Sequence, residues 1–256
     1  MSYSVCMAVA LTACLTVLVS GKKYDIFALF RVMKVLPYGA VGAALGGKAL
    51  YALTRMGKGS FGLLDVLGGF VFYGAFLGAL AGIAVFCART KNHFLDIADV
   101  FASILPLGQA IGRFGCYFNG CCYGRAYMGW LSVWYPVHGK MIKVFPTWFL
   151  ESGFCFLLFL GFWQIKTRKK SGFYLALYGL LYPAFRFIIE FWRGDEVRGV
   201  WFGILSTSQI LSLGLFCGGL SLAAFLYLHK VPENLMFEER RIYTNDSDHM
   251  ARYTEQ

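Results

Sequence analysis

Four polar side chains, two of them arginines that can bind an anion, follow one another at helical spacing in an apolar stretch of the C-terminal half. Tyr182, Arg186 and Glu190 lie at i, i+4 and i+8, and Arg193 follows three residues later. On an α-helix these positions share one face. Ionisable residues inside a membrane span are costly and are candidates for function by default. We interpret this face as a binding site for a lipid phosphate; a structural Arg–Glu pair between helices is the alternative.

A second group of candidate residues lies at 112–124, with the sequence GRFGCYFNGCCYG. Its glycines allow backbone N–H groups to approach an anion closely. Arg113 can form a bidentate pair with a phosphate. The segment follows an apolar stretch, so we expect it at the outer end of a membrane helix.

The elements that must position these groups are strongly apolar. Of 256 residues, 58% are hydrophobic and 15% are charged, against about 25% charged in a soluble domain. This composition excludes an ordinary soluble enzyme and a disordered chain, and 8 cysteines are too few for a disulfide-dense secreted domain. Seven stretches can each form a membrane helix, although the fourth is short and the second contains lysines. They are about 2–20, 33–54, 63–88, 97–113, 147–165, 172–191 and 203–228.

The basic residues orient this all-α, seven-helix membrane protein. The net charge is +10, and basic clusters collect in cytoplasmic loops, so nucleic acid is not an expected partner. The N-terminus is therefore expected outside and the C-terminus in the cytoplasm. We expect a transmembrane domain at 1–231 with an outer loop at about 114–146, a polar cytoplasmic tail at 232–256, and a first helix that is retained rather than cleaved. The clusters after the odd-numbered spans are Lys22 and Lys23; Arg89 and Lys91; Lys166, Arg168, Lys169 and Lys170; and Lys230, Arg240 and Arg241.

Six segments, in order along most of the chain, resemble the prolipoprotein diacylglyceryl transferase family. The segment 112–124 resembles the family signature G-R-x-G-N-F-x-N-x-E-x-x-G and matches it at Gly112, Arg113, Gly115, Asn119 and Gly124. The others are Tyr3-Ser4; Leu45-Gly46-Gly47-Lys48 with Tyr51; Pro146-Thr147 with Glu151; Tyr182-x-x-Phe185-Arg186 with Glu190, Phe191 and Arg193; and Ser208-Gln209-Ile210-Leu211-Ser212.

The chain departs from the family pattern mainly at groups that can handle protons. It has Cys116 where the family has Asn and Cys121 where the family has Glu. Tyr73 stands in place of a histidine in the third span, and Phe145 in place of another. The anion-binding residues are thus retained while several candidate acids and bases are not.

The resemblance implies transfer of the diacylglyceryl group of phosphatidylglycerol to the lipobox cysteine of a preprolipoprotein signal peptide. A thioether forms and glycerol phosphate leaves, in the cytoplasmic membrane of a bacterium, with no cofactor and no metal. Arg113, Arg186 and Arg193 would stabilise the departing phosphate, and Glu151 and Glu190 would orient arginines or substrate hydroxyls. The substrate-binding residues that the resemblance implies are Tyr3, Lys48, Tyr51, Gly112, Gly115, Asn119, Gly124, Tyr182, Arg193 and Gln209.

The base that removes the thiol proton is left open by the sequence. A phenolate base costs about 4 kcal/mol at neutral pH, so Tyr73 is expected to donate a hydrogen bond or position the substrate. His138, the one histidine expected on the outer side, either replaces the missing base or is an idle loop residue. The field of the arginines could also lower the thiol pKa without any base.

Three cysteines, Cys116, Cys121 and Cys122, gather where the outer segment begins. A structural disulfide, simple packing, and redox or acceptor chemistry are all open readings, whereas no nearby histidine spacing suggests zinc. They also define an alternative function, that of a membrane thiol oxidoreductase. A further alternative keeps the lipid site with another acceptor, and a last one is a non-catalytic lipid-binding or transport protein.

Overall fold

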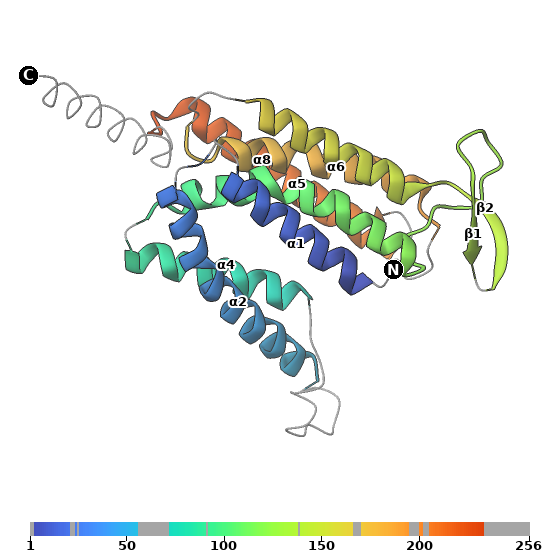
Figure 1. Cartoon of the computed structure of the whole chain (residues 1–256), viewed down its shortest axis with the longest axis horizontal. Coiled ribbons are helices and arrows are strands. Elements are labelled where there is room, and N and C mark those ends of the chain that lie inside the picture. Colours follow the sequence, from blue (N-terminus) through green and yellow to red (C-terminus); the bar gives the residue numbers. More distant parts are fainter. Residues whose placement is uncertain are drawn as a thin grey trace, which may run out of the picture. The chain divides into compact units, whose positions relative to one another are not determined.

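The computed structural model describes residues 3–20, 24, 26–55, 72–90, 92–137, 139–165, 170–194, 200–201 and 205–232. Within them the chain is mainly helical, as predicted, with two short antiparallel hairpins (Figure 1). The helices are α1 (Tyr3–Ser20), α2 (Ile26–Arg55), α4 (Phe72–Thr90), α5 (Phe94–Phe118), α6 (Thr147–Gln164), α7 (Phe173–Ile189) and α8 (Thr207–Leu228), and a 3₁₀ turn, η1 (Glu190–Trp192), follows α7. The strands are β1 (Val133–Val137), β2 (Lys140–Val144), β3 (Val200–Trp201) and β4 (Leu205–Ser206).

Five helical segments among the described residues are long and apolar enough to cross a membrane. α4 contributes a shorter apolar segment, Leu77–Thr90. A mainly helical chain with several helices suited to cross a membrane is therefore confirmed, whereas the count of seven spans and the orientation stay predictions. Most of the basic clusters used to orient the chain, and nearly all of the tail, lie outside the described residues. The five segments are Tyr3–Ser20, Leu29–Leu53, Phe94–Phe118, Phe173–Trp192 and Thr207–Leu228.

The chain divides into two compact units, and residues Tyr24–Ile97 form the smaller one. Here α2 and α4 lie side by side (Figure 1). A Cβ added at Gly42 would overlap the carbonyl oxygen of Gly78, and one added at Gly78 would overlap that of Gly42. The two backbones are thus in direct contact. Small residues at a helix interface allow such close approach in membrane proteins.

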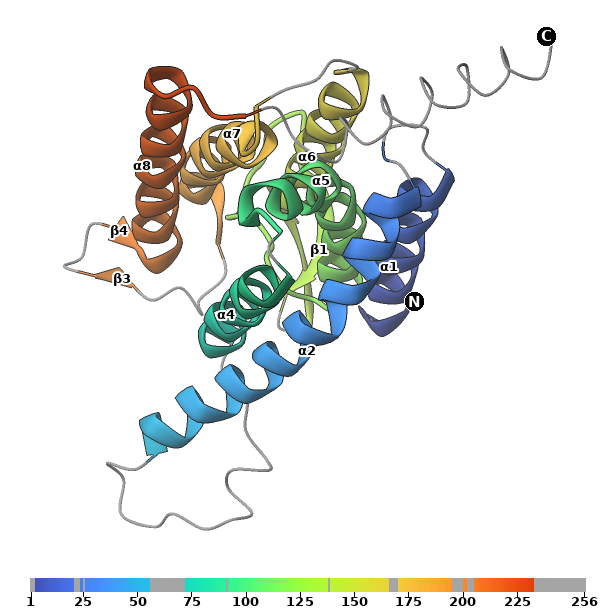
Figure 2. The same cartoon turned by 90° about the vertical axis from the view of Figure 1, so that its left-hand side faces the viewer.

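The larger unit contains residues 1–23 and 98–256 and includes α1, most of α5, and α6, α7 and α8 (Figure 2). Polar side chains satisfy two of its helix ends. The carboxylate of Asp99 in α5 accepts from the N–H groups of Gly172 (2.8 Å) and Leu175 (2.9 Å) at the start of α7. Lys170 Nζ donates to the carbonyl of Leu226 at 2.6 Å near the end of α8. In hydrocarbon such groups must be satisfied internally, so these contacts fix where both helices end.

The fourth span, predicted at about 97–113, is longer in the structure. The corresponding helix, α5, continues past residue 113 to Phe118. It then ends in two hydrogen bonds, from Cys121 N to Cys116 O (3.2 Å) and from Gly120 N to Tyr117 O (3.4 Å), with Gly120 at φ +73°. This is a Schellman motif, which requires a left-handed residue after the helix. The part of the predicted outer loop up to Phe118 is therefore helical. The β1–β2 hairpin lies beyond the ends of α5 and α6 (Figure 1).

Candidate functional site

Helices α5, α6 and α7 bring three predicted site residues to one buried carboxylate, Glu151. Arg113 of α5 forms an ion pair with Glu151 Oε1. The hydroxyl of Tyr182 in α7 donates to the same oxygen at 3.0 Å and accepts from Arg113 Nη2 at 3.4 Å. Arg186 Nε, one turn further along α7, lies 3.9 Å from that oxygen. Glu151 is 3% exposed, so these interactions act in a medium that screens them weakly.

A second buried carboxylate, Glu190, lies on the other side of Arg186. Arg186 Nη2 is 2.9 Å from Glu190 Oε2, and Arg193 Nη1 is 3.7 Å from the same atom. Arg186 Nη2 also donates to Ser208 Oγ at 2.9 Å, across to α8. Ser208 was not among the predicted site residues. Its place in the Ser-Gln-Ile-Leu-Ser segment was the available signal, but a lone serine carries no charge that would single it out.

The charges of this site do not cancel. Arg113, Arg186 and Arg193 face Glu151 and Glu190, which leaves a formal charge of +1 for the group. Arg186 is 8% exposed, and its Nη1 atom has no hydrogen-bond acceptor among the described residues. Buried donors are nearly always paired in folded proteins. A positive group with one unpaired, fixed donor is suited to receive an anion such as a phosphate.

The glycines of the 112–124 segment have packing roles that differ from the predicted anion nest. A Cβ at Gly115 would lie 3.1 Å from the ring of Tyr3, so Gly115 admits α1 against α5. One at Gly124 would overlap the carbonyl oxygen of Phe145. Gly112 and Gly115 lie inside α5, whose N–H groups are used by the helix. Their backbone N–H groups are therefore used within the helix, and a role of these glycines in substrate binding stays a prediction.

The other predicted residues differ in where the structure places them. Arg193 joins the site through Glu190, whereas Asn119 is exposed where α5 ends. Gln209 is buried in a capping box, accepting from Ser206 N at 2.9 Å while Ser206 Oγ accepts from Gln209 N at 3.2 Å. A substrate contact by Gln209 is therefore not needed to explain its burial.

Two further predicted residues, Lys48 and Tyr51, lie near the end of α2 in the smaller unit. Tyr73 belongs to α4, but its side chain lies outside the described residues, as does His138. The interpretation of these residues therefore stays at the level of the sequence.

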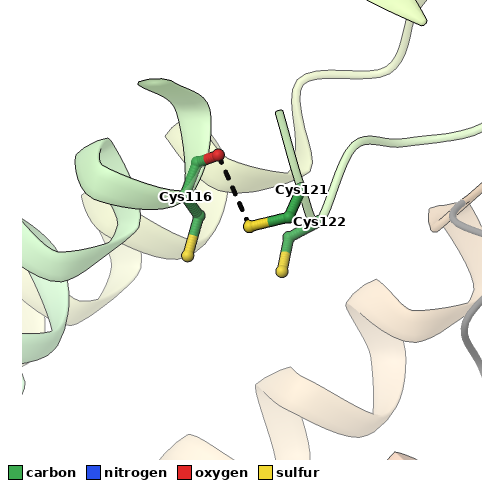
Figure 3. A group of neighbouring side chains, drawn as sticks. All are labelled: Cys116, Cys121 and Cys122. Atoms are coloured by element: carbon green, nitrogen blue, oxygen red, sulfur yellow. Dashed lines mark hydrogen bonds between the residues drawn. The ribbon is translucent and has the colours of Figure 1, made fainter. Parts of the chain in front are cut away.

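Cys116, Cys121 and Cys122 form a compact group of thiols (Figure 3). Their Sγ atoms all lie within 4.8 Å of one another, and none of the three is in a disulfide, so the disulfide that the sequence left open is not present. Burial, followed by the neighbouring Cys122, raises the pKa of Cys121. Arg113 Nη1 donates to Cys122 Sγ at 3.9 Å, which places the thiols beside the half-buried Arg113 of the site.

Comparison with known proteins identifies the family. The prolipoprotein diacylglyceryl transferase family matches residues 1–225. The chain is 35% identical over 190 residues to phosphatidylglycerol–prolipoprotein diacylglyceryl transferase 2 of Clostridium perfringens, covering 71% of this chain and 73% of the relative. It is 36% identical over 183 residues to the Clostridium tetani transferase, covering 68% and 72%, and 33% identical over 196 residues to that of Bordetella avium, covering 72% and 73%. A match over most of the chain, together with the arginine site at the expected motifs, shows that the chain belongs to the prolipoprotein diacylglyceryl transferase family.

Proposed function

We propose that the protein transfers the diacylglyceryl group of phosphatidylglycerol to the lipobox cysteine of a preprolipoprotein. The relatives that it resembles are named for this reaction. The observation that carries the proposal is the Nη1 donor of Arg186, which has no acceptor in the described part of the chain and lies in a buried group of net positive charge. A lipid headgroup phosphate is the anion that a site inside a bundle of membrane helices meets.

The proposed chemistry is a displacement at carbon. The thiolate sulfur attacks the glyceryl carbon that carries the phosphate ester, a carbon–sulfur bond forms, and the carbon–oxygen bond breaks. Its electron pair passes to the phosphate oxygen, so negative charge grows on the leaving glycerol phosphate. Fixed donors aimed at this growing charge stabilise the transition state more than the substrate. Arg186 is proposed as the main donor and Arg113 as the second.

The carboxylates have a different role in this proposal. Glu151 and Glu190 hold the guanidinium of Arg186 between them, at 3.9 Å and 2.9 Å. Tyr182 fixes Glu151 from the other side. An arginine side chain placed in this way loses little conformational freedom when phosphate arrives, so the donor is oriented before the reaction begins.

The acceptor thiol must lose its proton, and we propose His138 as the base. Its replacement by alanine is expected to slow turnover about 100-fold at neutral pH if it acts as a general base. This effect should shrink above about pH 8.5, where a thiol ionises unaided. Tyr73→Phe is expected to lower activity only modestly, because a phenol is a poor base at neutral pH. A harmless His138→Ala with an inactive Tyr73→Phe would reverse the assignment.

We also propose that α4 and α6 complete seven membrane spans, with the N-terminus outside and the C-terminus cytoplasmic, in the bacterial cytoplasmic membrane. The support is their length of 19 and 18 residues and their apolar composition. Cysteines introduced at 166–170 should react only with reagents on the cytoplasmic side. Labelling of these positions from outside would overturn this topology.

The decisive experiment incubates the purified protein with phosphatidylglycerol and a lipobox peptide, followed by mass spectrometry of the peptide. A diacylglyceryl thioether on the cysteine, with release of glycerol phosphate, is expected. Lipid movement without glycerol phosphate would instead indicate a transporter. Thiol oxidation that survives loss of Arg186 would indicate an oxidoreductase. A different modified acceptor would retain the lipid site and change the substrate.

A further inference from the structure

Cys116, Cys121 and Cys122 have no part in the chemistry proposed above. Their Sγ atoms lie within 4.8 Å of one another, and all three side chains are half-buried. Cys121 Sγ donates to the carbonyl oxygen of Cys116 at 3.6 Å (Figure 3). The feature is therefore a cluster of three reduced sulfurs that solvent can reach.

The way in which α5 ends brings the first two sulfurs together. In a Schellman motif the third residue from the helix end and the second residue after its cap are neighbours, and they usually make an apolar contact. Here these positions are Cys116 and Cys121, with the left-handed Gly120 between them. The thiols of Cys116 and Cys121 thus lie where two apolar side chains usually meet in this motif.

The third sulfur is positioned by an uncommon backbone conformation. Cys122 has φ +61°, and among the described residues other than glycine it alone has a positive φ. This conformation costs about 1–2 kcal/mol for such a residue. Thr147 Oγ1 donates to the Cys122 carbonyl at 2.7 Å, and Tyr135 OH donates to that of Tyr117 at 2.6 Å. The surrounding hydrogen bonds therefore hold all three cysteines in place.

We propose that Cys116, Cys121 and Cys122 form a three-thiolate site for a thiophilic metal ion of the zinc and cadmium type. Thiolates bind such ions at about 2.3 Å, so three sulfurs around one ion lie roughly 4 Å apart. The observed separations require only small shifts. Binding releases three thiol protons and forms three metal–sulfur bonds, with no oxidant or reductant. A disulfide would use two of the sulfurs and leave the third without a role. This inference revises the expectation of no metal, which rested on the lack of histidine spacing.

Occupancy of this site is expected to act on Arg113, and this step rests on the proposed function. A divalent ion with three thiolates carries a net charge of −1. Arg113 Nη1 already lies 3.9 Å from Cys122 Sγ, so its guanidinium would pair with the charged cluster. A headgroup phosphate would then compete for the same arginine. Because the phosphate would lose a charge-assisted hydrogen bond from Arg113, the KM for phosphatidylglycerol should rise about tenfold.

Binding is tested by titrating the reduced, purified full-length protein with cadmium(II) and recording the thiolate-to-cadmium charge-transfer absorption. X-ray absorption then counts the sulfur neighbours of the ion. We expect one ion per chain with three sulfur neighbours. Cys121→Ser and Cys122→Ser should each weaken binding about 100-fold or more, since even indirect partners of a metal contribute 10- to 100-fold. The control, Cys217→Ser on α8, removes an exposed free thiol and should bind like the parent.

The proposal is overturned if the parent binds no ion, or if Cys121→Ser and Cys122→Ser bind it as the parent does. It is also overturned if thiol counting on protein taken from membranes shows a disulfide within the cluster. Both serine variants are nearly isosteric with cysteine, and unchanged thermal unfolding without metal will show that they fold.

The activity arm compares KM for phosphatidylglycerol with and without cadmium(II) in the parent and in Cys217→Ser. Absence of transferase activity would count against the proposed function alone, because the spectroscopic result does not depend on turnover. Metal binding with an unchanged KM would overturn the coupling to Arg113.

Discussion

The α2–α4 pair and the α5–α6–α7 group join membrane helices in opposite ways. Between α2 and α4 the contact is made by glycines whose missing side chains let carbonyl groups touch the neighbouring helix. Between α5, α6 and α7 it is made by long charged side chains that meet at Glu151. Lipid tails remove most of the hydrophobic drive for association, so both close packing and polar contacts are needed.

The two contacts differ in whether they leave a polar group available to bind a ligand. A glycine contact is complete, because it satisfies van der Waals packing and has no group to offer a ligand. The charged contact is incomplete, because Arg186 retains a buried donor with no acceptor among the described residues. Burying such a group costs stability. We therefore expect substitutions in the first region to change stability and those in the second to change mainly activity.

The largest expected effect comes from Arg186. Arg186→Ala should lower kcat/KM about 100- to 1000-fold, the usual loss on removing one preorganised donor. Arg186→Lys should fail as well, since an ammonium cannot contact Glu190, Ser208 and a phosphate in the geometry of a guanidinium. The measurement is product formation with phosphatidylglycerol and a lipobox peptide. Near-normal turnover in Arg186→Ala would mean that the pair with Glu190 is structural.

The glycine contact is tested within one helix. Gly42→Ala should destabilise the protein by about 3 kcal/mol, the upper end of overpacking costs, because its Cβ meets a backbone carbonyl that has no rotamer to change. The matched control is Gly39→Ala, also in α2, whose Cβ would lie 3.8 Å from Ile83 and should be tolerated. Thermal unfolding in detergent distinguishes the two. Equal stability of the variants would contradict the close approach of α2 and α4.

More of the charged region than of the glycine contact could be predicted from the sequence, for a physical reason. The spacing of Tyr182, Arg186 and Glu190 defines one face of α7 and of the turn η1 that continues it, because residues four apart on a helix are neighbours. No such rule fixes the distance between helices, so the contact of Ser208 with Arg186 was missed. The roles of Gly42 and Gly78 were missed as well, because the glycines of one helix do not indicate which other helix packs against them. The extension of α5 to Phe118 was missed because its last residues look like a loop.

Tyr182→Phe sharpens the comparison, since it alters the charged region without altering its charges. The variant loses the hydroxyl that donates to Glu151 at 3.0 Å and accepts from Arg113 at 3.4 Å. Both residues keep their ion pair, but the carboxylate has one fewer contact to orient it. We expect kcat/KM to fall about tenfold, the value of one hydrogen bond to a charged group. A larger fall, equal to that of Arg186→Ala, would place the hydroxyl in direct contact with the reacting atoms.

The smallest effect is expected at Asp99, where a buried charge of the larger unit has a structural role. Its carboxylate accepts from Gly172 N and Leu175 N, two of the N–H groups that a helix start leaves without partners. Asp99→Asn keeps the volume and one acceptor oxygen, but presents an amide NH₂ to the other N–H and loses the favourable interaction with the helix dipole. We expect a loss of about 1 kcal/mol in stability with kcat/KM unchanged, measured by thermal unfolding in detergent and by the peptide assay. Asp99→Ala, which removes both acceptors, should cost more. If Asp99→Asn instead lowers activity and leaves stability intact, the distinction between charges that hold helices and charges that bind substrate does not apply at this end of α7.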